Sequence, residues 1–238
     1  MSKKVKFTID GNEISAEEGK NLLDVACENG YYIPALCHMK GHKPAGSCRL
    51  CNVKVNGRIM TACTTLVSEG MEVITEDEEL AELRKTILEA MFVDGNHFCP
   101  ACEKSGVCDL QALAYKHKIM SPKFKYEFSN KKVEAEVPKI MLEKNRCILC
   151  KKCIRAIKSK DGKNIFGFKA RGKKLEITMD EELAAQMTDE DIQRAMDICP
   201  VGTIIKKEKG FKIPIGKRKY DKKPIGDNVE KHKEKEKD

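Results

Sequence analysis

The first third of the chain combines short alternating segments with two turn signals. Apolar and polar side chains alternate over residues 5–9, as they do in a half-buried strand. Asp10-Gly11 and Asn56-Gly57 are strong hairpin signals, and residues 22–27 between them carry one apolar helical face. The predicted strands are residues 5–9, 52–55, 58–61 and 71–75. This order of elements is compatible with a β-grasp domain.

Two helices are predicted next. The first carries an apolar stripe at helical spacing, formed by Leu80, Leu83, Ile87, Leu88 and Met91. Thr75 and Glu78 match the capping-box pattern at its start, and Gly95 can stop it. A shorter helix is expected over residues 109–117, with its apolar side chains on one face.

The last third of the chain predicts a hairpin and then a helix. Segments 164–170 and 174–178 have strand character and flank Arg171-Gly172. Thr188 is expected to begin a helix that delivers Cys199 at its end.

Composition favours several small domains over one large core. Of 238 residues, 5% are aromatic, none is Trp and 34% are charged, so small domains here would need covalent or metal cross-links. The N-terminus lacks the apolar region of a secretory signal, and no run approaches the roughly 20 apolar residues of a membrane span. We therefore expect a cytoplasmic protein whose twelve cysteines are reduced, and whose clustered cysteines form metal or redox sites rather than disulfides.

Net charge raises a second possibility. The formal charge of +8 could indicate nucleic-acid binding. Part of the excess lies in residues 210–238, a basic C-terminal tail whose last residues are of mixed charge without an apolar anchor. A solvated surface and a mobile tail explain this charge more simply, so no nucleic-acid partner is expected.

The C-terminal cysteine group has the most specific spacing. Its members are Cys147, Cys150, Cys153 and the distant Cys199. Two equal short intervals let one tight loop present three thiolates to a cubane, while the remote cysteine supplies the fourth ligand. Ile157 stands where a two-cluster ferredoxin has its next cysteine, so a single [4Fe–4S] cluster is predicted. Structural zinc is the alternative, but zinc sites favour paired C-x₂-C knuckles.

The N-terminal cysteine group resembles the plant-type [2Fe–2S] pattern. Its members are Cys37, Cys48, Cys51 and Cys63. Gly41 and Gly46 let backbone N–H groups turn toward an anionic cluster. Zinc competes at this spacing, and the strand–hairpin context favours [2Fe–2S]. His38 and His42 are interpreted as loop residues of this site.

The middle group supplies only three thiols, those of Cys99, Cys102 and Cys108. A fourth ligand is needed, and His97 is the nearest candidate, because neutral imidazole can replace thiolate at iron. Other possibilities are His117, Cys27 or a three-iron cluster. Cys27 lies on an apolar helical face and is more simply a small buried hydrophobic residue.

These elements and cysteine groups predict an α+β protein. It would have an N-terminal β-grasp [2Fe–2S] ferredoxin-like domain, a small helical His/Cys [4Fe–4S] module and a C-terminal ferredoxin-like [4Fe–4S] domain. The predicted boundaries are residues 1–78, 79–120 and 138–209, followed by the tail at 210–238.

The three motifs together resemble a known family. Their order, ending in Cys199-Pro200-Val201-Gly202, is similar to the N-terminal part of the large iron–sulfur subunit of respiratory complex I. It is closer still to the diaphorase iron–sulfur subunit of soluble NAD(P)-linked nickel–iron hydrogenases, some of them electron-bifurcating. The resemblance implies one [2Fe–2S] and two [4Fe–4S] clusters, with His97 as a ligand. Complex I proteins place three residues between this histidine and the next cysteine, whereas only Phe98 intervenes here.

The resemblance also implies a function. The chain would carry electrons between a flavin- and NAD(P)-binding subunit and the hydrogenase small and large subunits, beside a thioredoxin-like [2Fe–2S] subunit. It would perform no substrate chemistry by itself, and it contains no G-x-G-x-x-G fingerprint. The alternatives are the same relay in a formate dehydrogenase or a respiratory NADH dehydrogenase and, more distantly, a zinc-rich nucleic-acid-binding module.

Overall fold

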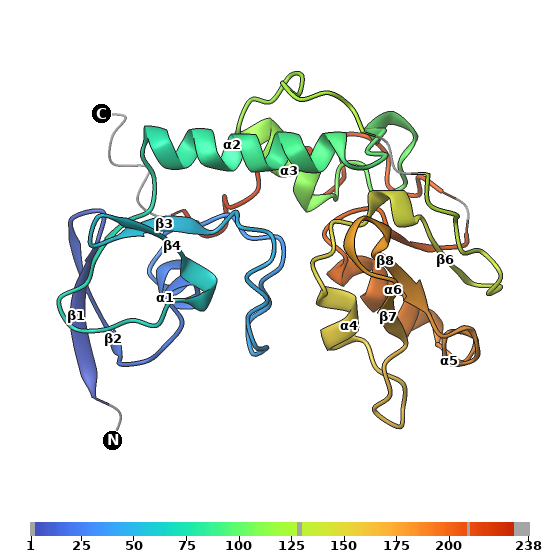
Figure 1. Cartoon of the computed structure of the whole chain (residues 1–238), viewed down its shortest axis with the longest axis horizontal. Helices are drawn as coiled ribbons and strands as arrows, with labels where there is room; N and C mark the ends of the chain where they lie inside the picture. Colours follow the sequence, from blue (N-terminus) through green and yellow to red (C-terminus); the bar gives the residue numbers. More distant parts are fainter. Residues whose placement is uncertain (1–2, 128–129, 209, 231–238) are drawn as a thin grey trace. The chain divides into compact units, whose positions relative to one another are not determined.

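The computed structural model describes residues 3–127, 130–208 and 210–230, which form two compact units. Residues 3–88 and 224–230 form the first unit, and the described residues between 89 and 223 form the second. Helix α2 (Glu78–Val93) begins in the first unit and ends in the second (Figure 1).

A five-stranded mixed sheet organises the first unit, in the order β2-β1-β5-β3-β4. The strands are β1 (Lys4–Ile9), β2 (Asn12–Glu17), β3 (Asn52–Val55), β4 (Arg58–Thr61) and β5 (Glu72–Ile74). Strands β1 and β5 are parallel, and the other neighbours are antiparallel. Helix α1 (Leu22–Glu28) and the short 3₁₀ turn η1 (Ala62–Thr64) complete this unit. The arrangement agrees with the predicted β-grasp architecture.

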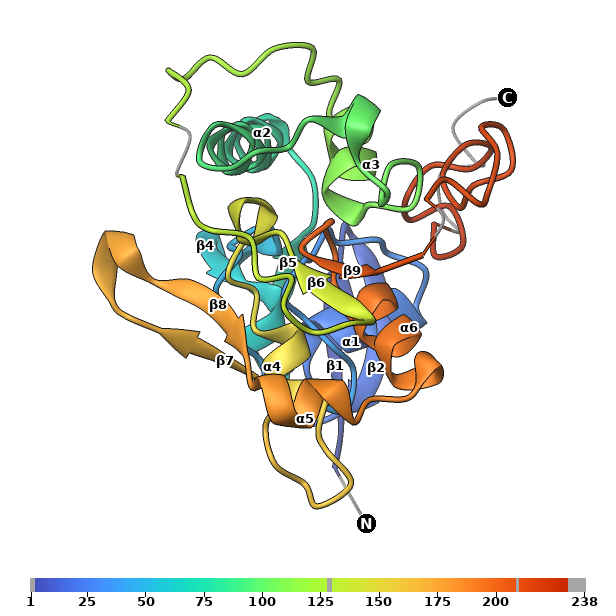
Figure 2. The same ribbon diagram turned by 90° about the vertical axis from the view of Figure 1, so that its right-hand side faces the viewer.

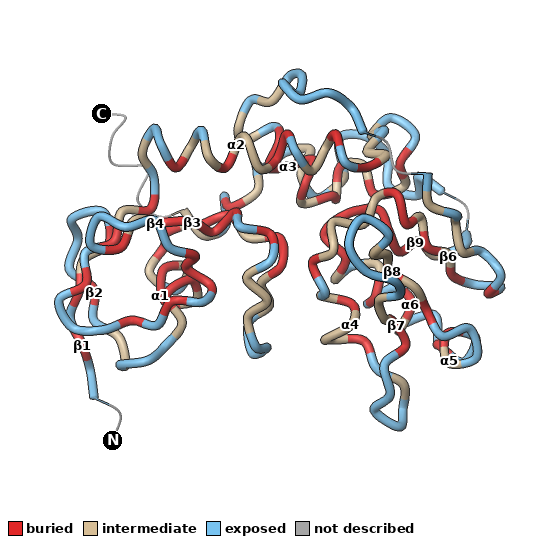
Figure 3. The backbone as a smooth tube through the Cα atoms, viewed as in Figure 1, coloured by how far each residue is buried: buried red, intermediate tan, exposed pale blue. Residues whose placement is uncertain are grey.

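The core of this unit follows from the alternation seen in the sequence. Val5, Phe7 and Ile9 alternate with more exposed residues along β1 and form one apolar core with the buried residues of α1. Figure 3 shows buried positions in both elements. Asn21 caps α1, since its Oδ1 accepts a hydrogen bond from the backbone N–H of Leu23 at 3.1 Å. Cys27, expected to be buried, is only partly buried and packs against this core.

The predicted capping box of α2 is wrong. The Oδ1 atom of Asp77 accepts from the backbone N–H of Leu80 at 2.8 Å, so Asp77 caps the helix. The hydroxyl of Thr75 donates instead to Asp10 Oδ2 at 2.5 Å. Thr75 is therefore used to fix the end of β5 to the turn after β1.

The second unit contains two small antiparallel sheets and several short helices. Strand β6 (Ile140–Leu142) pairs with β9 (Ile204–Lys206), and β7 (Phe166–Lys169) pairs with β8 (Glu176–Met179) (Figure 2). Its helices are α3 (Asp109–Lys116), α4 (Lys152–Ala156), α5 (Glu181–Ala185) and α6 (Asp189–Ile198). The 3₁₀ turns are η2 (Cys99–Ala101), η3 (Lys144–Arg146) and η4 (Gly172–Lys174).

Helix α6 begins and ends as the sequence indicates. Thr188 is its N-cap and forms a capping box with Asp191, and Cys199 is its C-cap. Helix α3 likewise ends at Lys116, with His117 as its C-cap. The predicted hairpin is present, but η4 occupies its turn.

Part of the predicted basic tail is anchored to the second unit. The backbone N–H of Tyr220 donates to Gly106 O at 2.9 Å, and its hydroxyl donates to Asp109 Oδ1 at 2.5 Å. Arg218 pairs with Asp221 at 2.7 Å. The last residues, 231–238, predicted to be mobile, lie outside the described residues. Across the described ranges, none of the helices has the length and apolar character needed to cross a membrane.

Candidate metal centres

The first site lies in the first unit, where four thiols converge. Cys37, Cys48, Cys51 and Cys63 are at most 3% exposed. The thiol of Cys37 hydrogen bonds with those of Cys48 and Cys63, and the thiol of Cys51 with that of Cys63. Cys51 directly precedes β3 and Cys63 lies in η1, so the sheet fixes two members while the preceding loop brings the other two.

Hydrogen bonds among these thiols give them different pKa values. Hydrogen bonds from the thiols of Cys48 and Cys63 lower the pKa of Cys37. The hydrogen bond with Cys37, together with burial, raises the pKa of Cys48. The hydrogen bonds with Cys37 and Cys51, together with burial, raise the pKa of Cys63. Such crowding of thiols is expected where a polynuclear centre draws several thiolates to one place.

The loop around this site has the backbone freedom that its glycines indicate. Gly41 and Gly46 have φ angles of +79° and +60°. A Cβ atom at Gly46 would lie 3.2 Å from Thr64 Cγ2, so a side chain there would press on the turn that carries Cys63. His38, interpreted as a loop residue, is bound through Nε2 to Asp24 Oδ1 of α1 at 2.8 Å. His42 is exposed.

The second site is a small cavity in the second unit. Four of its lining residues are the predicted ligands His97, Cys99, Cys102 and Cys108. Cys99 lies in η2 and Cys108 is the N-cap of α3, where its Sγ accepts from the backbone N–H of Gln111 at 3.4 Å. Of the rival fourth ligands, His117 is not among the described residues that line this cavity, and Cys27 belongs to the first unit.

Burial determines the protonation of this second site. It lowers the pKa of His97 to about 4, with a smaller contribution from the positive charge of Arg146. Burial also raises the pKa of Cys108 to about 12. The imidazole of His97 is therefore neutral at pH 7, the form that binds a metal. Its ring packs edge-on against Phe92, with ring centroids 5.5 Å apart.

The third site is a separate cavity lined by Cys147, Cys150, Cys153 and Cys199. Leu149 and Lys151 have positive φ angles of 54° and 62°, which turn the loop so that its thiols share one side. Burial, followed by the charge of Cys199, raises the pKa of Cys150 to about 12. The other walls are mostly apolar, formed by Ile148, Phe168, Ile177, Val201 and Ile204.

The donor sets fit iron–sulfur clusters. Two sites offer four sulfur donors each, and the remaining one offers three sulfurs with an imidazole, in buried surroundings. Within the described part of the chain, no three His, Cys, Asp or Glu residues have the arrangement that holds a single metal ion.

Two residues at the second site could not be found from sequence. Arg146 immediately precedes Cys147 of the third site, yet its side chain lines the second cavity. Gly202 follows Cys199 and also lines the second cavity. No sequence pattern links either residue to the His/Cys group, because the tertiary fold alone brings them there.

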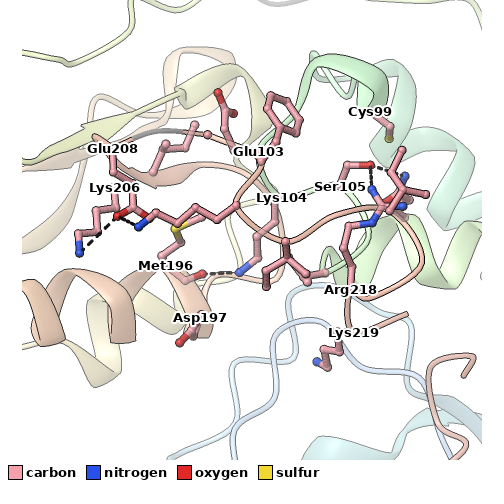
Figure 4. A pocket seen from close by; sticks show the side chains of 18 of the residues that line it. Cys99, Glu103, Lys104, Ser105, Met196, Asp197, Lys206, Glu208, Arg218 and Lys219 are labelled. Carbon is pink, nitrogen blue, oxygen red and sulfur yellow. Dashed lines mark hydrogen bonds and ion pairs between the residues drawn. The ribbon is translucent and has the colours of Figure 1, made fainter. Parts of the chain in front are cut away.

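A larger groove borders the second site. Cys99 lines it together with Lys104, whose ammonium donates to Met196 O at 2.6 Å near the end of α6 (Figure 4). Arg218 lies on the same groove and contacts Ser105. The anchored part of the C-terminal segment is thus one wall of the groove.

These sites and the fold define a class, the multicluster iron–sulfur electron carriers. Three family models match consecutive parts of the chain. They describe a 2Fe-2S iron-sulfur cluster binding domain (residues 2–78), an NADH-ubiquinone oxidoreductase-G iron-sulfur binding region (84–123) and a ferredoxin-like domain of NADH-quinone oxidoreductase subunit 3 (137–205).

The chain belongs to the family of γ subunits of NAD-reducing hydrogenase. It is 47% identical over 218 residues to the γ subunit of the NAD-reducing hydrogenase HoxS of Cupriavidus necator, covering 91% of this chain and 93% of that protein. A solved NAD⁺-reducing [NiFe]-hydrogenase in the H₂-reduced state contains a similar chain, with a TM-score of 0.86 and 39% identity over 93% of this chain and 95% of that one. The family predicted from the motifs is confirmed.

More distant relatives are longer proteins. The chain is 35% identical to the α subunit of the NADPH-Fe(3+) oxidoreductase of Geobacter sulfurreducens over 87% of its length, but spans only 25% of that protein. It is 32% identical to the NADH-quinone oxidoreductase G protein of Rickettsia prowazekii and spans 31% of it. These matches agree with the predicted similarity to complex I.

Proposed function

We propose that this chain transfers electrons between a flavin- and NAD(P)H-binding subunit and the catalytic subunits of a hydrogenase. The observation that supports this most directly is the grouping of the predicted ligands at three separate buried places. The 47% identity to a hydrogenase γ subunit supports the choice of partners. Those partners would be the flavin subunit, a thioredoxin-like [2Fe–2S] subunit, and the hydrogenase small and large subunits.

The chain's own residues would bind and insulate the redox centres. Cys37, Cys48, Cys51 and Cys63 would hold a [2Fe–2S] cluster. His97, Cys99, Cys102 and Cys108 would hold one [4Fe–4S] cluster, and Cys147, Cys150, Cys153 and Cys199 the other. Each cluster, when bound, supplies a one-electron redox couple. The neutral imidazole of His97 would add no charge, whereas each thiolate adds one negative charge.

One segment separates the second and third sites. Gly202 lines the second cavity, while Cys199, Val201 and Thr203 line the third. A single stretch of backbone thus forms a wall of both sites. In a relay this short separation would favour electron transfer between them.

Chemical analysis of the purified chain tests the proposal. The protein should be brown and contain about ten iron and ten sulfide per chain. Cys153→Ser should lose about four of each if Cys153 is a cluster ligand, whereas Cys27→Ser should lose none. A colourless, zinc-rich protein without sulfide, even after anaerobic reconstitution, would contradict the proposal.

A second candidate is the same relay in a respiratory NADH dehydrogenase, favoured by the 32% identity to the NADH-quinone oxidoreductase protein of Rickettsia prowazekii. Purification from the native host separates the two. Hydrogenase subunits should accompany the chain under the first proposal, and subunits of a quinone-reducing complex under the second.

A further inference from the structure

Arg146 extends from one cluster site to the other. Its backbone lies in η3, immediately before Cys147 of the third site. Its side chain, 12% exposed, lines the second cavity beside His97 and Cys99. The guanidinium is therefore the cation that the fold places in the wall of the His/Cys site, although its sequence neighbour belongs to the other site.

The charge of this guanidinium is only partly compensated. Its Nη1 atom lies 3.3 Å from Glu103 Oε2 and 3.3 Å from Gly202 O. Its Nε atom is buried and has no hydrogen-bond partner among the described residues. Arginine stays protonated in proteins, so it cannot avoid the cost of burial by losing its proton. Glu103 is 35% exposed and makes a single contact with Arg146, so solvent weakens its compensation.

The guanidinium shares the cavity with the predicted ligands. Arg146 lines it together with His97, Cys99, Cys102 and Cys108. A cation in the wall of a buried site stabilises negative charge that is added beside it.

We propose that Arg146 is the counter-charge of the second site and raises its reduction potential. The proposal rests on the proposed function, because it requires a cluster at this site. One-electron reduction adds one negative charge inside the cavity without making or breaking a bond. Arg146 stabilises that added charge and so favours the reduced state. Glu103 acts in the opposite direction, because its carboxylate partly neutralises Arg146.

Redox titration monitored by electron paramagnetic resonance tests this pair of roles. Arg146→Gln should lower the equilibrium constant for reducing the second site at least tenfold, which is about 59 mV for one electron. Arg146→Lys keeps the charge and should recover most of the loss. Glu103→Gln should shift the equilibrium severalfold in the other direction. The signal of the second site is identified by its change in His97→Cys.

Arg194→Gln is the matched control, since it removes the same charge from an exposed position on α6. Its potentials should equal those of the parent. If Arg146→Gln loses its clusters, the test rests on Glu103→Gln. A raised reduction potential of the second site in that variant supports the proposal, and an unchanged potential overturns it. Iron and sulfide are measured first in the parent protein. Their absence contradicts the proposed function, whereas intact clusters with unmoved potentials contradict only the role of Arg146.

Discussion

The thiol of Cys102 lies against the backbone of Gly202. A Cβ atom at Gly202 would come within 2.7 Å of Cys102 Sγ and 3.3 Å of Lys104 Cβ. The contact continues along the chain, since the backbone N–H of Asp109 donates to Pro200 O at 2.9 Å. The loop after Cys199 therefore fits closely to the loop that carries the second site, and only a residue without a side chain fits at position 202.

Gly202→Ala should disturb the second site. The added methyl group must displace the sulfur of Cys102, a predicted ligand, or the backbone of the shared wall, and overpacking of this kind costs about 1–3 kcal/mol. We expect a changed or missing paramagnetic signal from the second site and a lower urea midpoint of unfolding. Gly167→Ala in β7 is the control, because a Cβ there meets nothing within 4 Å. If the two variants have the same paramagnetic signals and the same urea midpoint, Gly202 is not in close contact with Cys102.

Local features of the fold follow from the sequence. Strands β3 and β4 occupy the predicted residues, because Asn56-Gly57 defines a tight turn between alternating segments. Helix α6 starts after its predicted cap, Thr188, and Cys199 is its C-cap. Short-range rules suffice in these cases, since the residues that decide the structure are neighbours along the chain.

Other features depend on contacts between distant residues. Thr75 matches a capping box, but its hydroxyl is hydrogen bonded to Asp10, which is distant from it along the chain. Tyr220 belongs to a segment that its composition marks as a tail, yet it is hydrogen bonded to Gly106 and Asp109. Arg146 lines the second cavity, whereas its neighbour Cys147 lines the third. Periodicity and motif spacing carry no information about such pairings.

His97→Ala should affect a single cluster. His97 lines the second cavity with its neutral imidazole, so its loss removes one predicted ligand there and leaves the other two sites untouched. We expect one of three reduced-cluster signals to change. His117→Ala, which replaces the rival histidine, should leave all three as they are. If His117→Ala changes a cluster signal and His97→Ala changes none, the assignment of His97 as a ligand is wrong.

Arg84→Gln should destabilise the first unit. Arg84 is 3% exposed, and its Nη2 atom donates to Asn52 O and Thr75 O, both at 2.6 Å. A shorter neutral side chain leaves buried carbonyl groups without donors, so a loss of about 2–4 kcal/mol in unfolding free energy is expected. Urea unfolding followed by circular dichroism measures it. Arg58→Gln on the exposed face of β4 should change stability by less than about 0.5 kcal/mol.

Glu134 makes the stability of the second unit depend on pH. Lys144 is 2% exposed, and its ammonium pairs with Glu134 at 2.6 Å and with Glu176 at 3.2 Å. Burial alone would raise the pKa of Glu134, but the hydrogen bonds from Lys144 and from the Thr178 hydroxyl outweigh it, so its pKa is lowered. A lowered carboxyl pKa stabilises the fold above the ordinary value of about 4.3, and this stabilisation is lost as pH falls below it.

Glu134→Gln should therefore be less stable than the parent at pH 7, by about 2 kcal/mol, because Lys144 keeps only one carboxylate close by. The difference should shrink as the pH falls below about 4.3, because the unfolded parent then binds a proton at Glu134 that the folded parent, with its lowered pKa, binds only at lower pH. Urea midpoints of both proteins at each pH give this difference, and any acid sensitivity of the clusters is common to both. Glu182→Gln, an exposed carboxylate on α5, should differ from the parent at neither pH. A difference between Glu134→Gln and the parent that stayed constant from pH 7 to pH 4 would show that the carboxylate charge of Glu134 is not what holds Lys144.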